Sequence, residues 1–180
     1  VIGAAVAFAA IYWAVQILFK PKVAAQQKME QLLDAARTAP KPATDRLIYA
    51  LQQRLRGKPQ DSQSLAQLGN AYLQKARETG DPSYYAKAEQ VFKGAIENDS
   101  ANAEALTGMG ALCLARHEFK EALQWGRRAV EFNSYKAAAF GVIGDACIEL
   151  GRYDEAVETI QKMVNLRPDL SSFTRISYSR

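Results

Sequence analysis

Hydrophobic positions recur in residues 103–170 with a spacing that predicts paired helices. Residues 103–136 align without a gap on residues 137–170, an offset of 34 residues. In each copy, apolar residues occupy the fourth, seventh and eleventh places, which lie on one face of a helix, and a second apolar stripe follows a short break. We therefore expect an all-α fold, built as a solenoid of helix-turn-helix units.

The copy at 137–170 contains residues with clear structural roles in such a unit. Gly144 lets a second helix approach closely because it has no Cβ, and Pro168 closes the unit because proline fits poorly inside a helix. Gly144, Ala156 and Pro168 stand at the eighth, twentieth and thirty-second places of the copy. This pattern resembles that of the tetratricopeptide repeat (TPR) family, in which these places are the usual markers. The earlier copy has His117 where the later one has the turn residue Gly151.

The pattern divides the chain into segments. Three TPR repeats, at 62–102, 103–136 and 137–170, fill residues 61–170. The first is seven residues longer than the last between its glycine and its closing position, and we expect the insertion to extend the turn between its two helices. Residues 43–60 resemble a degenerate half-repeat that caps the stack, and residues 171–180 resemble the truncated first helix of a further repeat.

Residues 1–19 are apolar and contain no charged side chain. A helix of this length rises about 28 Å, close to the thickness of a bilayer core, so the segment predicts a single transmembrane anchor helix. A buried helix and a cleaved signal peptide are the alternatives. Small residues at helical spacing predict packing against another membrane helix, although alanine is also simply common in such helices. The small residues are Gly3, Ala7, Ala10 and Ala14, and Gln16 is expected either to hydrogen-bond across such a contact or to lie near the headgroups.

Charge is distributed unevenly along the chain. Residues 20–60, a basic juxtamembrane neck, carry nine basic and three acidic side chains, whereas residues 61–180 carry 14 basic and 16 acidic ones. Because the repeats are mildly acidic, we exclude nucleic acid and expect the neck to contact anionic lipid headgroups, although a solvated helical face accounts for most of these charges. Lysines directly after the apolar segment favour a single-pass protein of the cell membrane with its repeats on the cytoplasmic side. In this layout the chain resembles membrane-anchored TPR proteins of bacterial type.

The sequence offers little for catalysis. It has one histidine, no CxxC motif, no glycine-rich phosphate loop and no nucleophile with an apparent base, so we expect no enzyme activity, cofactor or metal. Cys113 and Cys147 occupy equivalent inward places in neighbouring repeats. They are expected to be buried thiols, too far apart for a disulfide.

The TPR resemblance implies binding of a partner peptide or helix in a concave groove lined by fixed positions of each first helix. The candidate groove residues are Asn70, Leu73, Gln74, Glu104, Thr107, Leu114, Gly141, Asp145, Ile148 and Glu149. The same positions also hold Gln63, Ala66, Ala111, Ala115 and Ala138. None of them is basic, which argues against the acidic chaperone tails that some TPR domains bind.

We expect instead an apolar or amphipathic protein segment with some positive charge. Asp145 and Glu149, four residues apart, would pair with a basic residue of the partner, unless they are merely solvated. The function expected is a membrane-anchored protein-docking scaffold. The alternatives are an accessory subunit of a larger membrane complex and an assembly factor resembling the TPR proteins of cytochrome c maturation.

Overall fold

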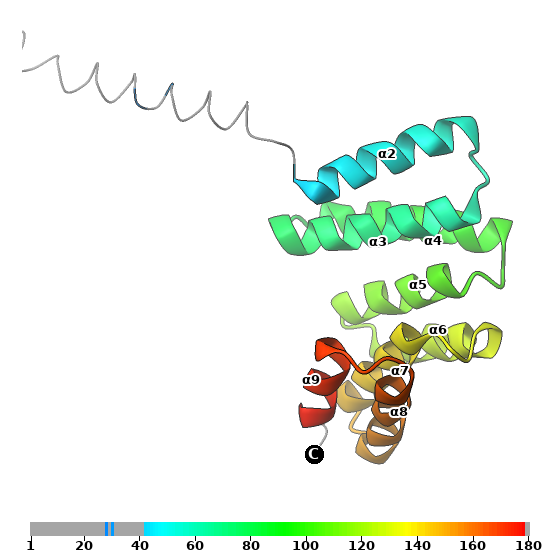
Figure 1. Ribbon diagram of the computed structural model, residues 1–180, viewed down its shortest axis with the longest axis vertical. Helices are drawn as coiled ribbons and strands as arrows, with labels where there is room; N and C mark the ends of the chain where they lie inside the picture. The colour runs from blue at the N-terminus through cyan, green and yellow to red at the C-terminus, as the bar shows by residue number, and fades with distance from the viewer. Residues whose placement is uncertain (1–27, 29, 31–41, 179–180) are drawn as a thin grey trace, which may run out of the picture. The chain divides into compact units, whose positions relative to one another are not determined.

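The computed structural model of the chain describes residues 28, 30 and 42–178, and residues 42–178 form one compact unit by themselves. Every regular element in residues 42–178 is a helix, as Figure 1 shows. In chain order the helices are α2 (Ala43–Gly57), α3 (Ser62–Thr79), α4 (Ser83–Asn98), α5 (Ala103–Ala115), α6 (Phe119–Phe132), α7 (Ala137–Glu149), α8 (Tyr153–Leu166) and α9 (Leu170–Tyr178).

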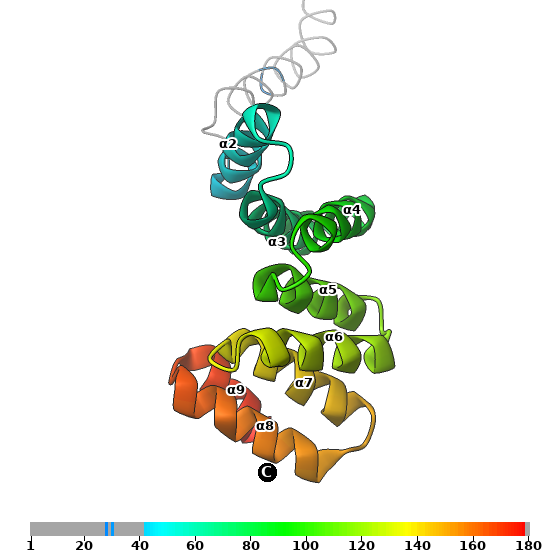
Figure 2. The ribbon, with the colours of Figure 1, turned by 90° about the vertical axis from the view of Figure 1, so that its right-hand side faces the viewer.

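The helices pair in the order of the sequence repeats. Helices α3 and α4, α5 and α6, and α7 and α8 form three hairpins, while α2 packs on α3 and α9 packs on α8 and α7. The first helices of successive hairpins, α3, α5 and α7, contact one another in series, whereas α4, α6 and α8 do not contact each other. Figure 2 shows the resulting stack from the side. The first helices therefore make one continuous layer.

Local chemistry explains where the helices begin and end. Asp61 and Asn102 cap α3 and α5, since each side chain accepts a hydrogen bond from a backbone N–H in the first turn of its helix. Gly151, with φ +73°, stands in the turn between α7 and α8. His117 takes the same left-handed conformation, φ +62°, at the equivalent turn between α5 and α6. A residue with a Cβ therefore occupies a position that favours glycine.

The seven-residue insertion in the first repeat lengthens its helices. Helix α3 has 18 residues against 13 in α5, and α4 has 16 against 14 in α6. The connection between α3 and α4 is only residues 80–82, so the expectation of an extended turn is wrong. The reason is that Gly80, with φ +69°, ends α3 only after the helix has gained more than a full turn.

Close packing at Gly144 brings together the two helices of the third hairpin. A Cβ added at Gly144 of α7 would lie 2.5 Å from Cγ1 of Ile160 in α8. Ile160 and Ala156 are fully buried at this contact. The glycine therefore allows the close approach of two helices that the sequence pattern predicts.

No helix among the described residues is both long and apolar enough to cross a membrane. Even α3, which has 18 residues, carries three charged side chains near its end, Lys75, Arg77 and Glu78. The helix buries one face against the stack and exposes the other, so it is amphipathic rather than apolar all round. This finding contradicts the predicted localisation, a single-pass cell-membrane protein with cytoplasmic repeats, and we correct it accordingly. The predicted anchor at 1–19, its small-residue stripe and most of the basic neck lie outside the described residues.

Candidate functional site

A groove cavity of about 280 Å³ lies where α5 and α7 run side by side, bordered by α8 and α9. Its floor consists mainly of small side chains. The residues that line it are Asn70, Glu104, Thr107, Gly108, Ala111, Leu114, Ala138, Gly141, Val142, Asp145, Met163, Ser171 and Arg175. They come from three successive first helices and from the two helices that follow, so the stacking of repeats creates the cavity.

At one side of the groove cavity, polar side chains link the first two repeats. Asn70 of α3 donates a hydrogen bond from Nδ2 to Oε1 of Glu104 in α5, 2.5 Å away. The other carboxylate oxygen of Glu104 is paired with the ammonium of Lys136, the residue before α7. Glu104 therefore already has an amide and a cation as partners within the chain.

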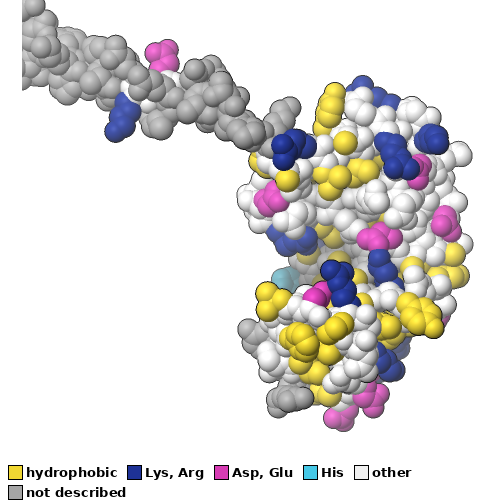
Figure 3. All heavy atoms as spheres, viewed as in Figure 1, with side chains coloured by type: hydrophobic (Ala, Val, Ile, Leu, Met, Phe, Trp, Pro, Cys, Tyr) yellow, Lys and Arg dark blue, Asp and Glu magenta, His cyan; other side chains and the backbone are white. Residues whose placement is uncertain are grey.

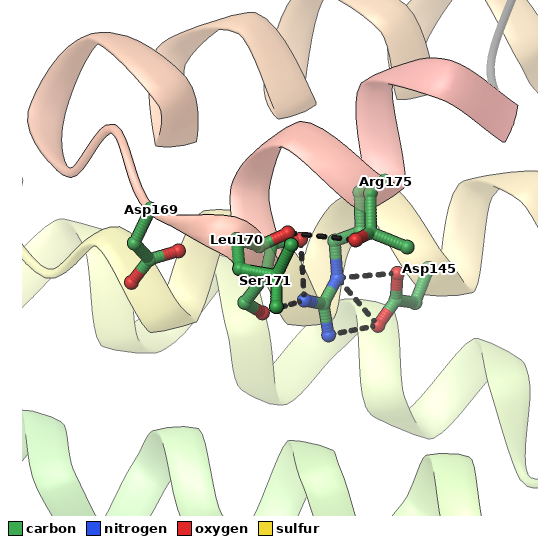
Figure 4. A pocket seen from close by; sticks show the side chains of 6 residues that line it. Asp145, Asp169, Leu170, Ser171 and Arg175 are labelled. Carbon is green, nitrogen blue, oxygen red and sulfur yellow. Dashed lines mark hydrogen bonds and ion pairs between the residues drawn. The ribbon is translucent and has the colours of Figure 1, made fainter.

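At the other side, Asp145 of α7 binds Arg175 of α9 through both carboxylate oxygens (Figure 4). The guanidinium Nε lies 2.8 Å from Oδ1 and Nη2 lies 2.8 Å from Oδ2. Nη1 donates to the hydroxyl of Ser171, one turn earlier in α9, at 2.5 Å. Both side chains of the ion pair are 31% exposed, and the hydrogen bond to Asp145 raises the pKa of Arg175. The pair is thus a two-point contact at the edge of solvent.

The structure brings together six of the ten candidate groove residues: Asn70, Glu104, Thr107, Leu114, Gly141 and Asp145. The other four do not line the groove cavity. Leu73 is buried in the core, Ile148 is half-buried against the core, and Gln74 and Glu149 are exposed elsewhere on their helices. In α7 the last turn, with Ile148 and Glu149, therefore lies beyond the cavity, whereas Leu114 in the last turn of α5 lines it.

Sequence reasoning missed the residues that close the groove cavity from α8 and α9, chiefly Met163 and Arg175. The fixed TPR positions are defined on first helices of complete repeats, and residues 171–180 looked like a truncated one. The fifth place counted from Ser171 is Arg175, which matches Thr107 and Gly141 in the earlier repeats. Extending the 34-residue register past Pro168 would have found it.

The described residues hold no group of three or more His, Cys, Asp or Glu side chains placed to bind a metal ion. Both cysteines are free and buried. Burial raises the pKa of Cys113 to about 12 and also raises the pKa of Cys147, so these thiols are unsuited to act as nucleophiles at neutral pH. The groove offers shape, apolar surface and fixed charge, which suits binding.

Comparison with known sequences agrees with the repeat pattern. Residues 137–170 match the tetratricopeptide repeat family, and residues 83–137 match a second description of the same repeat. Tetratricopeptide repeat protein 1 of Schizosaccharomyces pombe is 30% identical over 133 residues, which is 67% of this chain and 12% of that protein. The chain thus spans about an eighth of the length of this relative.

Solved structures show the same fold. A thermophilic TPR protein from Thermus thermophilus superposes with a TM-score of 0.64 at 19% identity, over 73% of this chain and 70% of that one. The first TPR of Spaghetti (RPAP3), bound to the HSP90 peptide SRMEEVD, superposes with a TM-score of 0.58 at 19% identity, over 67% of this chain and 90% of that one. Repeat period, hairpin packing and these matches agree, and the chain belongs to the tetratricopeptide repeat family.

Proposed function

We propose that the chain is a protein-docking scaffold whose groove cavity holds one apolar side chain of a partner, flanked by a basic residue of the same partner. TPR domains bind protein partners and typically act without catalysis. The observation that carries the proposal is the groove cavity itself, which small residues of α5 and α7 keep open between two carboxylates.

The apolar part of the proposal rests on volume and lining. A cavity of ~150 Å³ lined by aliphatic side chains is enough to bind benzene. The groove cavity has about 280 Å³ and is bordered by Ala111, Leu114, Val142 and Met163. A leucine, methionine or phenylalanine side chain therefore fits, and because the groove is open on one side its partial burial would supply less than the ~3 kcal/mol of full burial, before ordering costs.

The charge part rests on Glu104 and Asp145, which lie on the two sides of the groove cavity. The nearby cations Lys136 and Arg175 are both paired with these carboxylates, so neither stands ready for an anionic ligand. An acidic tail would have to break an ion pair and bring more negative charge beside a carboxylate. We therefore propose that the partner is basic, unlike the acidic peptide bound in the RPAP3 structure.

An array of synthetic peptides tests this proposal. Each peptide contains one apolar residue (Leu, Met or Phe) and one charged residue (Arg, Lys or Glu), and the set varies the spacing between the two. The peptide SRMEEVD serves as an acidic reference. The matched variants are Ala138→Phe, which fills the groove cavity from an exposed rim position, and Ala86→Phe, the same change at an exposed position of α4.

The unchanged chain and Ala86→Phe should bind the apolar–basic peptides with equal affinity. Ala138→Phe should bind them at least tenfold more weakly. Binding of SRMEEVD in preference to the basic peptides would contradict the charge assignment. Equal binding by Ala138→Phe and Ala86→Phe would show that the groove cavity is not the docking site.

A further inference from the structure

Helix α9 is attached to the stack mainly by polar contacts. Among its described side chains only Ser172 is fully buried, whereas nine residues of α7 are buried. Of its large apolar side chains, Leu170 and Phe173 are 84% and 52% exposed, and Ile176 is half-buried. Figure 3 shows hydrophobic side chains on the part of the molecule where α8 and α9 lie in Figure 1. With so little apolar burial, α9 belongs to the least stable part of the described structure.

An ion pair to the groove ties α9 to α7, and a capping box stabilises the first turn of α9 itself. At the start of α9, Asp169 and Ser172 exchange hydrogen bonds between side chain and backbone, both 3.0 Å long. Farther along, Arg175 reaches the carboxylate of Asp145, and Arg175 and Ser171 both line the groove cavity. A Cβ added at Gly141 would lie 3.6 Å from the Arg175 Nε, so the guanidinium lies directly over the floor of the cavity.

We propose that α9 is an internal competitor for the groove: in the unbound chain Arg175 occupies Asp145, and an arginine of the partner replaces it and releases α9. This inference rests on the proposed function and adds how the same site is regulated. The exchange substitutes one guanidinium–carboxylate pair for another, so it removes no hydrogen bond from Asp145. The released helix uncovers the side of the groove cavity that Ser171 and Arg175 close.

The geometry also selects arginine over lysine. Asp145 accepts from two guanidinium nitrogens through its two oxygens, a planar arrangement that an ammonium group cannot reproduce. A lysine of the partner would thus replace two directed hydrogen bonds with one. The partner that displaces α9 should therefore carry an arginine next to its apolar anchor.

The test compares the full chain with three single variants, using a fluorescent array peptide that carries one leucine and one arginine, and its lysine counterpart. Arg175→Gln removes the competitor and Arg175→Lys keeps its charge. Arg152→Gln is the matched control, because Arg152 is a 46% exposed cation beside α8, paired with Glu155, that does not line the groove cavity. Circular dichroism of each variant checks that the helical stack is intact.

We expect Arg175→Gln to bind the arginine peptide roughly tenfold more tightly than the unchanged chain does. The reason is that the population in which Arg175 is paired with Asp145, which cannot bind the peptide, no longer reduces the apparent affinity. Arg175→Lys should lie between Arg175→Gln and the unchanged chain, and Arg152→Gln should match the unchanged chain. In the unchanged chain, the arginine peptide should speed hydrogen exchange of the amides of residues 170–178, as expected if binding displaces α9.

Two results would overturn the proposal that α9 competes with the partner for the groove. In one, Arg175→Gln binds the arginine peptide no more tightly than the chain does, while Ala138→Phe still abolishes binding; the proposed function then survives alone. In the other, the peptide protects residues 170–178 from exchange, which makes α9 part of the docking surface. If neither the chain nor Arg175→Gln binds any array peptide, the proposed function itself fails, and the competitor fails with it.

Discussion

Two glycine positions predict opposite effects of the same substitution. Gly69 lies inside α3, where an added Cβ would be 2.4–2.7 Å from three ring atoms of Phe92. Gly94 lies inside α4, where the nearest atom to an added Cβ is Cδ1 of Leu65, at 3.8 Å. We predict that Gly69→Ala destabilises the chain and that Gly94→Ala stabilises it.

The magnitudes follow from two opposing terms. Replacing glycine by alanine inside a helix contributes about 0.5–1 kcal/mol of stability in both places. At Gly94 nothing opposes this gain. At Gly69 the ring of Phe92 is fully buried, and a Cβ added at Gly108 of α5 would lie only 2.3 Å from the same ring, so the ring has no free space to move into. Overpacking of this kind costs about 1–3 kcal/mol, so after the helical gain is subtracted Gly69→Ala is expected to destabilise the chain by about 1 kcal/mol.

Urea unfolding of the full chain, followed by circular dichroism at 222 nm, measures both changes. The two variants should differ in free energy of unfolding by about 2 kcal/mol, with Gly94→Ala the more stable. Combining Gly69→Ala with Phe92→Leu should cost less than the sum of the single changes, because the smaller side chain leaves room for the new methyl group. If Gly69→Ala is as stable as Gly94→Ala, the close contact does not limit packing and the reasoning is refuted.

Three further predictions concern the turns, acid stability and the thiols. His117→Gly should raise the free energy of unfolding by up to about 1 kcal/mol and Gly151→Ala should lower it by about 1 kcal/mol, because both turns need positive φ; urea titration would contradict this if the signs were equal. The hydrogen bond from Arg127 lowers the pKa of Glu155, so the stability from this pair is present above the usual value of 4.5 and is lost as pH falls through the lower folded value. Arg127→Gln should therefore reduce the acid sensitivity of the melting temperature, and an unchanged pH profile would count against the pair. Cys113, with its pKa raised to about 12, should react with a disulfide reagent at pH 8 only at the rate of unfolding, and immediate reaction in the native chain would refute its burial.

The repeat architecture could be predicted from the sequence because it depends on local patterns. Apolar residues at helical spacing indicate the helices, and Gly144 and Gly151 mark a close contact and a turn, features that involve residues near one another in the chain. The comparisons confirm the family that this pattern indicated. The predicted localisation is contradicted, because no helix among the described residues is both long and apolar enough to cross a membrane.

The groove was only partly predictable, because its contacts join residues about one repeat apart. Glu104 is bonded to Asn70, 34 residues away, and Asp145 to Arg175, 30 residues away. Such pairings depend on how far each hairpin is rotated against the next, which the local pattern does not specify. The sequence suggested that Asp145 faces the groove, but not that a guanidinium of the same chain already occupies it.

The sequence by itself determined the helical repeat, its period and the small residues that let the helices approach, because these follow from side-chain size and spacing along one helix. Only the tertiary structure decided that the insertion lengthens α3 and α4. It also decided that α8 and α9 close the groove cavity and that Arg175 is paired with Asp145. The physical reason is that these features arise where separate helices meet, and the stacking of one repeat on the next fixes which side chains face each other there.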